Sequence, residues 1–398
     1  MLKTHVPVQH KESTPLLALD RQYAAIREEI LAAIERVCAS QQFVLGPEVD
    51  ALESEIAAFT GTKAAVACAS GTDALWLALV AAGIRPGDRV ITTPFSFFAS
   101  ASSIVRAGAQ PVFVDVDPTT LNLDSNKVQS RLVTDKSVGN DKSARPRIKA
   151  ILPVHLYGQC AEMDSIRQIA EDYGLLIIED AAQAIGAKWR SQAAGSMGAC
   201  AAFSFYPTKN LSAYGDAGIV TTRDPAMAAH MRRLRNHGSP ERYLHTEFGW
   251  NARMDAIQAA ILRVKLKYIN TWNQQRRERA AAYNRLLVEA ELISGQSTAP
   301  LKPLTTSAHA FHVFHQYVVR AEKRDELRKF LASRGIGTEI YYPIPLHLQP
   351  VFAYLGHKEG DFPESERAAK EVLALPMFPE LTEQEQQQVV TGIAEFYG

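Results

Sequence analysis

The chain has 398 residues, and 46% of them are hydrophobic. This length exceeds what one ordinary core supports, so we expect a large domain plus a smaller one. Its 43 Lys and Arg residues balance its 43 Asp and Glu residues, so no net field attracts nucleic acid or an anionic membrane. No segment approaches the roughly 20 apolar residues of a membrane span, and four cysteines without a C-x-x-C pair indicate a reduced cytoplasm.

The first half of the chain predicts an α/β core. Residues 1–15 read as a loose tail, after which helical apolar spacing begins at about Leu16 and a second helix follows Pro47 and ends at Gly61. Short apolar runs then alternate with helical stretches, which is typical of a mostly parallel sheet covered by helices. These runs are KAAVACAS, DRVITTP, QPVFVDV, IKAILPVHL and GLLIIED.

The second half predicts a connection and a smaller α+β domain. A polar stretch at 125–147 reads as a surface excursion, and the runs ACAAFSFYP and AGIVTT flank a turn that contains Lys209. After Asn251 we expect one long or kinked helix that joins two domains. The predicted divisions are a large domain at 16–255, a connecting helix at 256–290 and a small domain at 291–398.

The first candidate site is SGTDAL, where an apolar strand runs into glycine and hydroxyl residues before a helix. Free N–H groups at a helix start suit a phosphate, and Gly71 permits a close approach. Taken alone, the pattern more often marks an ordinary helix capped by Ser70 or Thr72. No G-x-G-x-x-G or G-x-x-x-x-G-K-[ST] motif is present, which disfavours a dinucleotide or a nucleoside triphosphate.

The second candidate is IIEDAAQAIGA, where Glu179 and Asp180 close an apolar strand. Ligands of open α/β sheets bind at this edge, so at least one carboxylate is placed to bind a metal, cap a helix or pair with a cationic nitrogen. A metal is disfavoured because no histidine or carboxylate cluster has ligand spacing. We interpret the nearby His155 as a hydrogen-bonded core histidine.

The third candidate is FSFYPTKNL, in which Ser204 lies in a strand and Lys209 in the turn after it. A lysine is usually on the surface, but an apolar strand and a small, glycine-bearing run flank this one, so its amine can lose water and become nucleophilic. A phosphate site, a carboxylate and such an amine match the phosphate anchor, pyridinium partner and Schiff-base amine that pyridoxal phosphate requires.

The order and wording of these motifs resemble the DegT/DnrJ/EryC1/StrS family of pyridoxal-phosphate-dependent sugar aminotransferases, over nearly the whole chain. The resemblance implies the type I aminotransferase fold, an α/β large domain with a smaller C-terminal domain. The matching segments are FVLGPEV, SGTDAL, TTPFSFFAS, PVFVDVDPTTLN, PVHLYGQ, IIEDAAQAIGA, FSFYPTKNL, GDAGIVTT, RNHGSPERY, GWNARMDAIQAAIL and YYPIPLHLQPVF.

The resemblance also implies roles for individual residues. Lys209 forms a Schiff base with the cofactor and moves a proton, and Asp180 pairs with the protonated ring nitrogen. Gln183 contacts the ring hydroxyl. Phe97 stacks on the ring face, with Phe98 as its rival and core packing as the alternative for both.

Further residues match the family's phosphate and substrate contacts. Gly71, Thr72 and Ser204 match phosphate anchors, and Asn251 matches an asparagine that reaches the phosphate from the partner subunit, which implies a homodimer with shared active sites. Arg253 either contacts an acidic sugar substituent or is a surface or interface residue.

The expected reaction is a ping-pong transfer of nitrogen from glutamate to the keto group of a nucleotide-linked sugar, with no metal and no nucleic-acid or membrane partner. Nucleotide contacts are expected from RNHGSPERY and around Tyr341, Tyr342 and His347, although turn chemistry alone also explains the latter segment. The alternatives are a dehydrating enzyme or lyase, a cyclitol or aminoshikimate-type aminotransferase, and a non-catalytic sensor. A dehydrating branch of the family carries histidine in place of the lysine, so Lys209 favours transamination.

Overall fold

The computed structural model describes residues 13–135, 147–293 and 299–398. Most of the predicted tail lies outside these residues, as do residues 136–146 of the polar excursion, whose first part forms a helix, Ser125–Thr134. Thr14, expected in the tail, is instead buried and bridges to Ile336, because its backbone bonds to Gly335 and Gly337 on either side. The segment before the first helix therefore packs on the C-terminal part of the chain.

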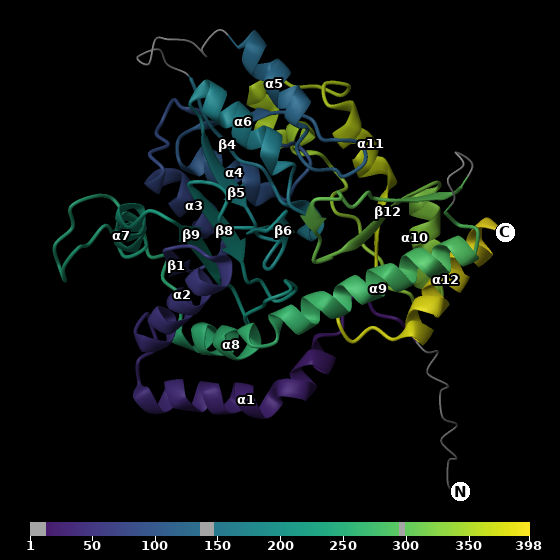
Figure 1. The fold of residues 1–398 in the computed structure, drawn as a ribbon, viewed down its shortest axis with the longest axis horizontal. Helices are drawn as coiled ribbons and strands as arrows, with labels where there is room; N and C mark the ends of the chain where they lie inside the picture. Colours follow the sequence, from purple (N-terminus) through teal and green to yellow (C-terminus); the bar gives the residue numbers. More distant parts are fainter. Residues whose placement is uncertain (1–12, 136–146, 294–298) are drawn as a thin grey trace, which may run out of the picture.

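A seven-stranded sheet forms the centre of the large α/β unit (Figure 1). Its order is β1-β9-β8-β5-β4-β2-β3. β9 runs antiparallel to both of its neighbours, β1 and β8, and the other pairs are parallel, so the predicted mostly parallel sheet is confirmed. The strands are β1 (Ala64–Cys68), β2 (Arg89–Thr92), β3 (Gln110–Phe113), β4 (Ile148–Ile151), β5 (Leu176–Asp180), β8 (Cys200–Ser204) and β9 (Gly218–Thr222).

Helices cover both faces of this sheet. They are α1 (Leu19–Ser40), α2 (Pro47–Thr60), α3 (Gly71–Ala81), α4 (Phe98–Arg106), α5 (Ser125–Thr134), α6 (Met163–Tyr173), α7 (Pro225–Leu234) and α8 (Ala256–Leu266). Alternate strand residues enter opposite cores: Ile177 packs with α1, α2, α6 and α8, whereas Ile178 packs with α3, α4 and α7. Side chains at the strand ends are therefore sorted between two faces.

The predicted connecting helix is two helices. After α8 ends at Leu266, α9 (Ile269–Glu289) leads away from the sheet toward the small domain (Figure 1). That part has an antiparallel sheet of β10 (Leu301–Pro303), β12 (Tyr317–Ala321) and β13 (Val372–Leu375). Its helices are α10 (Arg324–Ser333), α11 (Pro363–Glu371) and α12 (Glu383–Tyr397). A separate minor sheet pairs β6 (Lys188–Trp189) with β7 (Gln192–Ala193) and with β11 (Ala310–Phe311).

Two further observations bear on the sequence predictions. Within the described ranges, no helix is both long and apolar enough to cross a membrane. The four cysteines are free thiols: three are buried, and Cys38 is exposed near the end of α1.

Candidate active site

Four of the predicted site residues, Gly71, Asp180, Ser204 and Lys209, gather where the parallel strands end. Asp180 ends β5, Ser204 ends β8, and Gly71 begins the helix that follows β1. Because β9 runs the other way, its first residue, Gly218, lies at the same edge, and the loop from β8 to β9 that carries Lys209 spans this edge. The topology therefore brings together at this edge residues that lie almost 140 positions apart in the sequence, from Gly71 to Lys209.

Lys209 is a partly buried lysine whose amine has no hydrogen bond or ion pair among the described residues. Its backbone N–H donates to the Tyr206 carbonyl over 2.8 Å, which fixes the turn. Burial lowers the pKa of Lys209 to about 8, although the nearby Asp180 carboxylate acts to raise it. A substantial fraction of this amine is therefore neutral, and nucleophilic, at mildly alkaline pH.

Glu179 and Asp180 have different tasks. Glu179 bonds to His155 Nε2 over 3.0 Å and accepts the backbone N–H groups of residues 195, 197 and 198. Burial acts to raise the pKa of the Glu179 carboxyl, but these partners bring it below its ordinary value. Glu179 therefore holds a loop in place, and His155 is the hydrogen-bonded core histidine that the sequence suggested.

Asp180 is buried with fewer partners. Its Oδ2 accepts from Ser100 Oγ over 2.7 Å, and its Oδ1 accepts from the Ala182 N–H over 3.2 Å. Burial raises the pKa of the Asp180 carboxyl, and the Ser100 hydrogen bond is the strongest influence against that rise. A carboxylate holds about four lone-pair sites, so Asp180 retains capacity for a cationic partner.

Gly71 and Ser204 are in contact. A Cβ added to Gly71 would lie 2.5 Å from the Ser204 Cβ, so only glycine fits there. Ser70 caps α3 by accepting the Asp73 N–H over 3.1 Å, so the capped-helix interpretation is correct for Ser70. The N–H groups of Gly71 and Thr72 begin the helix and have no intrahelical partner, which leaves them able to bind an anion beside Ser204.

The two adjacent phenylalanines point to different neighbours. Phe97 is 58% exposed, and its ring centroid lies 6.1 Å from that of Tyr342. Phe98 packs instead on Phe352 at 5.7 Å, in a separate cluster. Gln183 donates from Nε2 to the Tyr342 hydroxyl over 3.2 Å. Phe97, Tyr342 and Gln183 are thus linked beside Asp180, and Phe98 is not among them.

The remaining predicted residues divide into near and distant ones. Tyr341 lies beside this group, since its carbonyl accepts the Tyr157 hydroxyl. His347 does not join it: its ring is buried against Phe362, and its Nε2 bonds to Glu366 over 3.0 Å. His347 therefore lies outside this group, and its expected substrate contact stays a prediction.

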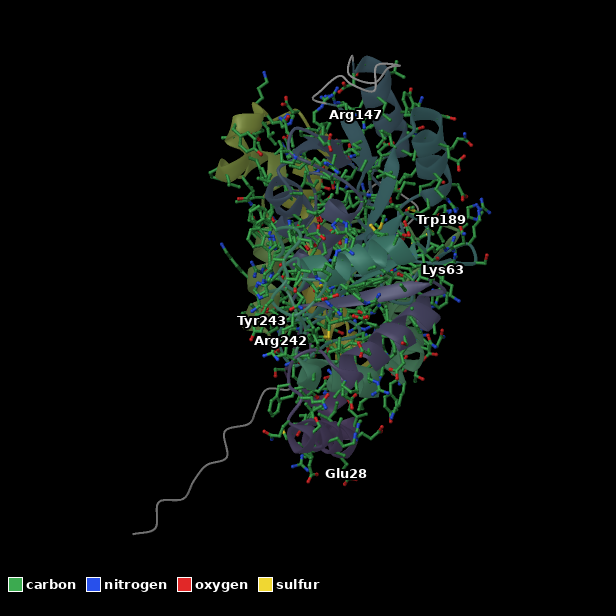
Figure 2. The ribbon with its side chains drawn as sticks, turned by 90° about the vertical axis from the view of Figure 1, so that its left-hand side faces the viewer. Glu28, Lys63, Arg147, Trp189, Arg242 and Tyr243 are labelled. Atoms are coloured by element: carbon green, nitrogen blue, oxygen red, sulfur yellow. The ribbon has the colours of Figure 1, made fainter. Side chains whose placement is uncertain are left out.

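Asn251 and Arg253 lie on the surface of this chain. Arg253 Nε donates to Asn251 Oδ1 over 3.1 Å, and the Ala69 N–H bonds to the carbonyl of the intervening residue, Ala252, next to the end of β1. The segment before Asn251 contains Arg242 and Tyr243. Figure 2 labels both on the side of the molecule that carries α7. Tyr243 is 83% exposed.

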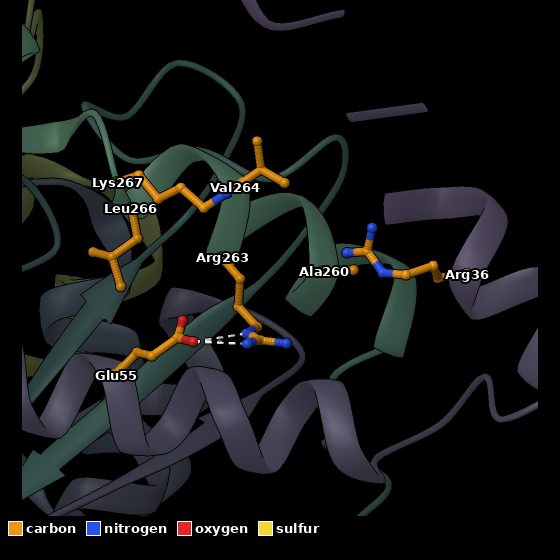
Figure 3. A pocket seen from close by; sticks show the side chains of 7 residues that line it. All are labelled: Arg36, Glu55, Ala260, Arg263, Val264, Leu266 and Lys267. Atoms are coloured by element: carbon orange, nitrogen blue, oxygen red, sulfur yellow. Dashed lines mark hydrogen bonds and ion pairs between the residues drawn. The ribbon is translucent and has the colours of Figure 1, made fainter. Parts of the chain in front are cut away.

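A pocket of about 300 Å³ between α1, α2 and α8 contains none of the predicted residues (Figure 3). Its Arg263 pairs with Glu55 over 2.8 Å and also with Glu48, and Lys267 pairs with Glu29. Two of its cationic side chains are thus paired with carboxylates, and none of the candidate site residues lines it, so we do not assign it as the active site.

Sequence reasoning missed Ser100 and Tyr157 as site residues. Two serines, Ser96 and Ser100, flank the start of a helix in the same motif as Phe97, and this was the available signal. Tyr157 has no such signal, because its backbone N–H reaches Gln183 Oε1 over 2.6 Å only in the folded chain.

The side chains present fit pyridoxal phosphate. Lys209 offers an amine of lowered pKa, Asp180 a buried carboxylate with free capacity, and Gly71 with Ser204 an anion site without a side chain in the way. This combination on an α/β sheet defines the class of pyridoxal-phosphate enzymes.

Comparison with known proteins identifies the family. The chain matches the DegT/DnrJ/EryC1/StrS aminotransferase family over residues 24–394, so it belongs to that family and is an aminotransferase. A pleiotropic regulatory protein of Geobacillus stearothermophilus is 51% identical over 97% of this chain and 99% of its own length. A dTDP-3-amino-3,4,6-trideoxy-alpha-D-glucose transaminase of Streptomyces venezuelae is 42% identical over 96% of each chain.

Solved structures agree on the fold. S. venezuelae DesV, solved in complex with a ketimine intermediate, has a TM-score of 0.88 and 41% identity over 96% of this chain and 98% of its own. Bacillus subtilis ntda, solved with bound cofactor PMP, has a TM-score of 0.84 and 30% identity over 98% and 89%. The family and the second structure imply that this chain depends on pyridoxal phosphate.

Proposed function

We propose that the protein transfers an amino group from glutamate to the keto group of a nucleotide-linked sugar. The observation that carries the transfer is Lys209, an amine of lowered pKa at the sheet edge beside Asp180 and the Gly71–Ser204 anion site. The sugar acceptor is supported by the Streptomyces venezuelae relative, whose name states a dTDP-linked amino sugar.

Each residue has a defined task in this proposal. Pyridoxal phosphate supplies an aldehyde that condenses with amines and a ring that accepts electrons. The helix start at Gly71 and Thr72, with Ser204, binds the phosphate, and Asp180 holds a positive charge on the ring nitrogen. Lys209 Nζ, when neutral, accepts a proton from a substrate carbon and returns one.

Aromatic side chains line the approach to these groups. The exposed ring of Phe97 offers a flat apolar face, and Gln183 provides an amide donor beside it. Burial raises the pKa of Tyr342, so its hydroxyl stays protonated at neutral pH and remains able to donate a hydrogen bond. We assign Phe97 and Gln183 to the cofactor ring, and Tyr341 and Arg253 to the substrate.

A second copy of the chain completes the site in this proposal. Phe248 is 94% exposed and Tyr243 83% exposed, and both lie just before Asn251. Exposed aromatic groups of this kind are typical of a protein interface. We propose a homodimer in which Asn251 of each chain reaches the phosphate held by the other.

The direct test is product analysis. Purified protein with pyridoxal phosphate, glutamate and a nucleotide-linked keto-sugar should yield 2-oxoglutarate and the amino sugar in equal amounts. An aminated cyclitol or aminoshikimate-type ring, or loss of water without nitrogen transfer, would establish one of the alternative reactions instead. A cytoplasmic location remains a prediction.

The name of the Geobacillus relative, a regulatory protein, favours one other candidate. In that case the protein binds the cofactor and acts on a partner without amino transfer. Isotope exchange separates the two: an aminotransferase moves ¹⁵N from labelled glutamate to the cofactor even without an acceptor, whereas a sensor that binds pyridoxal phosphate does not.

A further inference from the structure

Two serine hydroxyls lead in series to the Asp180 carboxylate. Ser100 Oγ donates to Asp180 Oδ2 over 2.7 Å, and Ser96 Oγ lies 2.7 Å from Ser100 Oγ. All three side chains are buried. A serine hydroxyl has one proton to donate, and Ser100 uses its proton on Asp180, so Ser96 must donate to Ser100. Both bonds therefore point toward the carboxylate.

The segment that carries these serines also carries an aromatic ring of the site. Ser96 and Phe97 directly precede α4, and Ser100 lies in its first turn. The Ser100 N–H donates to the Phe97 carbonyl over 3.1 Å, which fixes the turn. The exposed Phe97 ring and the buried hydroxyl pair are thus held by one short piece of backbone.

Other charged or titratable groups face Asp180 from three further elements. Lys209 approaches from the loop after β8 and His155 from the loop after β4, and both favour the ionised carboxylate. Tyr342 approaches from the small domain. Among the influences that favour ionisation, the Ser100 hydrogen bond is the largest. In contrast to Glu179, Asp180 therefore depends mainly on one side chain to remain charged.

We propose that Ser100, supported by Ser96, is a positioning residue that keeps Asp180 ionised and fixes one of its oxygens, leaving the other oxygen for a cationic ring nitrogen. The inference rests on the proposed cofactor role of Asp180 and extends it to the two hydroxyls behind the carboxylate. A charge-assisted hydrogen bond from a buried hydroxyl is stronger than a neutral one, and its loss leaves a buried charge poorly solvated.

The first test uses the full-length protein without cofactor. Ser100→Ala should raise the Asp180 titration midpoint in the folded state by about one pH unit. The unfolded state lacks this bond, so the loss of unfolding free energy in Ser100→Ala should grow as the pH rises through the folded-state pKa of Asp180 and vanish at lower pH. Thr92→Val removes another buried hydroxyl, which donates to the Leu152 carbonyl over 3.0 Å, and its effect should not depend on pH.

The second test measures the dissociation constant of pyridoxal phosphate between pH 5 and 9. Ser100→Ala should move the acid limb of this profile upward by about one pH unit, which is about tenfold in affinity on that limb, and Ser100→Thr should restore it. In an Asp180→Asn background, Ser100→Ala should add nothing. An unchanged profile in Ser100→Ala, or an equal shift in Thr92→Val, would overturn the positioning role.

The two tests separate two kinds of failure. If the unfolding measurement gives the pH-dependent loss but Asp180→Asn leaves cofactor affinity unchanged, the proposed function of Asp180 is wrong and the positioning role is overturned with it. If Asp180→Asn weakens binding and Ser100→Ala does not, the proposed function stands and only the serine pair is refuted.

Discussion

Glu179 and Asp180 are adjacent on β5, yet their carboxylates point to opposite faces of the sheet and have unequal numbers of partners. Glu179 is saturated by His155 and three backbone N–H groups. Asp180 has one hydroxyl and one backbone donor. The alternation of side chains along a strand thus assigns one carboxylate to structure and leaves the other for chemistry.

This contrast predicts opposite outcomes for two conservative substitutions. Asp180→Asn should preserve the free energy of unfolding and lower amino transfer on the order of 100-fold or more, because the ring nitrogen loses its anionic partner. Glu179→Gln should cost about 2–4 kcal/mol of stability, because the NH₂ group of the glutamine would face backbone N–H groups, which are also donors. Urea denaturation and single-turnover kinetics on both variants measure this. Equal stability losses would contradict the division.

Lys209 predicts a pH dependence. Its folded-state pKa of about 8 lies below the ordinary lysine value of 10.5, so the folded protein disfavours the charged amine. That cost is fully present below pH 8 and disappears as the pH rises toward 10.5. Lys209→Met should therefore stabilise the cofactor-free protein by about 1–2 kcal/mol at pH 7 and by less at pH 10. A variant equally stable to the parent at pH 7 would count against the lowered pKa.

The contact between Gly71 and Ser204 predicts a steric effect with a rescue. Gly71→Ala forces its methyl group against the Ser204 Cβ, and cofactor affinity should fall about tenfold or more as the anion site is displaced. Gly71→Ala combined with Ser204→Gly removes that overlap and should recover stability but not affinity, since the hydroxyl is gone. Thermal unfolding and cofactor titration separate the two quantities. Recovery of full affinity in the double variant would exclude Ser204 as an anchor.

Phe97 and Phe98 form a matched pair. Phe97→Ala removes an exposed ring and should weaken cofactor binding by about 0.5–1.5 kcal/mol, as expected for a stacked aromatic pair, with little change in stability. Phe98→Ala should instead lower stability by about 1 kcal/mol, because it loses its packing on Phe352. The assignment would be contradicted if cofactor titration showed weaker binding in Phe98→Ala and unchanged binding in Phe97→Ala.

Much of the fold could be predicted because the apolar runs are local signals. The runs that became β1, β2, β5 and β8 are short and bounded by turns, and the glycine after α2 indeed ends that helix in the left-handed region, at φ 69°. The break between α8 and α9 was anticipated only as a kink, because the apolar stripe continues across it. The burial of Thr14 depends on distant backbone at residues 335 and 337, which no local pattern reveals.

The site was less predictable wherever it depends on tertiary approach. Lys209, Asp180, Gly71 and Ser204 stand in motifs and do meet at one edge. The Ser100 hydroxyl meets the Asp180 carboxylate only in the folded chain, since the two residues are 80 positions apart in the sequence. The burial of His347 against Phe362 and its bond to Glu366 likewise depend on residues distant in the sequence, which the turn pattern around it does not reveal.

The identity of the reacting amine tests the account most directly. The chain offers a matched competitor in Lys265, whose pKa is likewise lowered to about 8. Lys265 is buried in α8, and its amine is bonded to Ser212 Oγ over 3.0 Å. Borohydride reduction of the protein with pyridoxal phosphate, followed by peptide mapping, should place the cofactor on Lys209 alone. Labelling of Lys265, or of any other lysine in place of Lys209, would contradict the central claim.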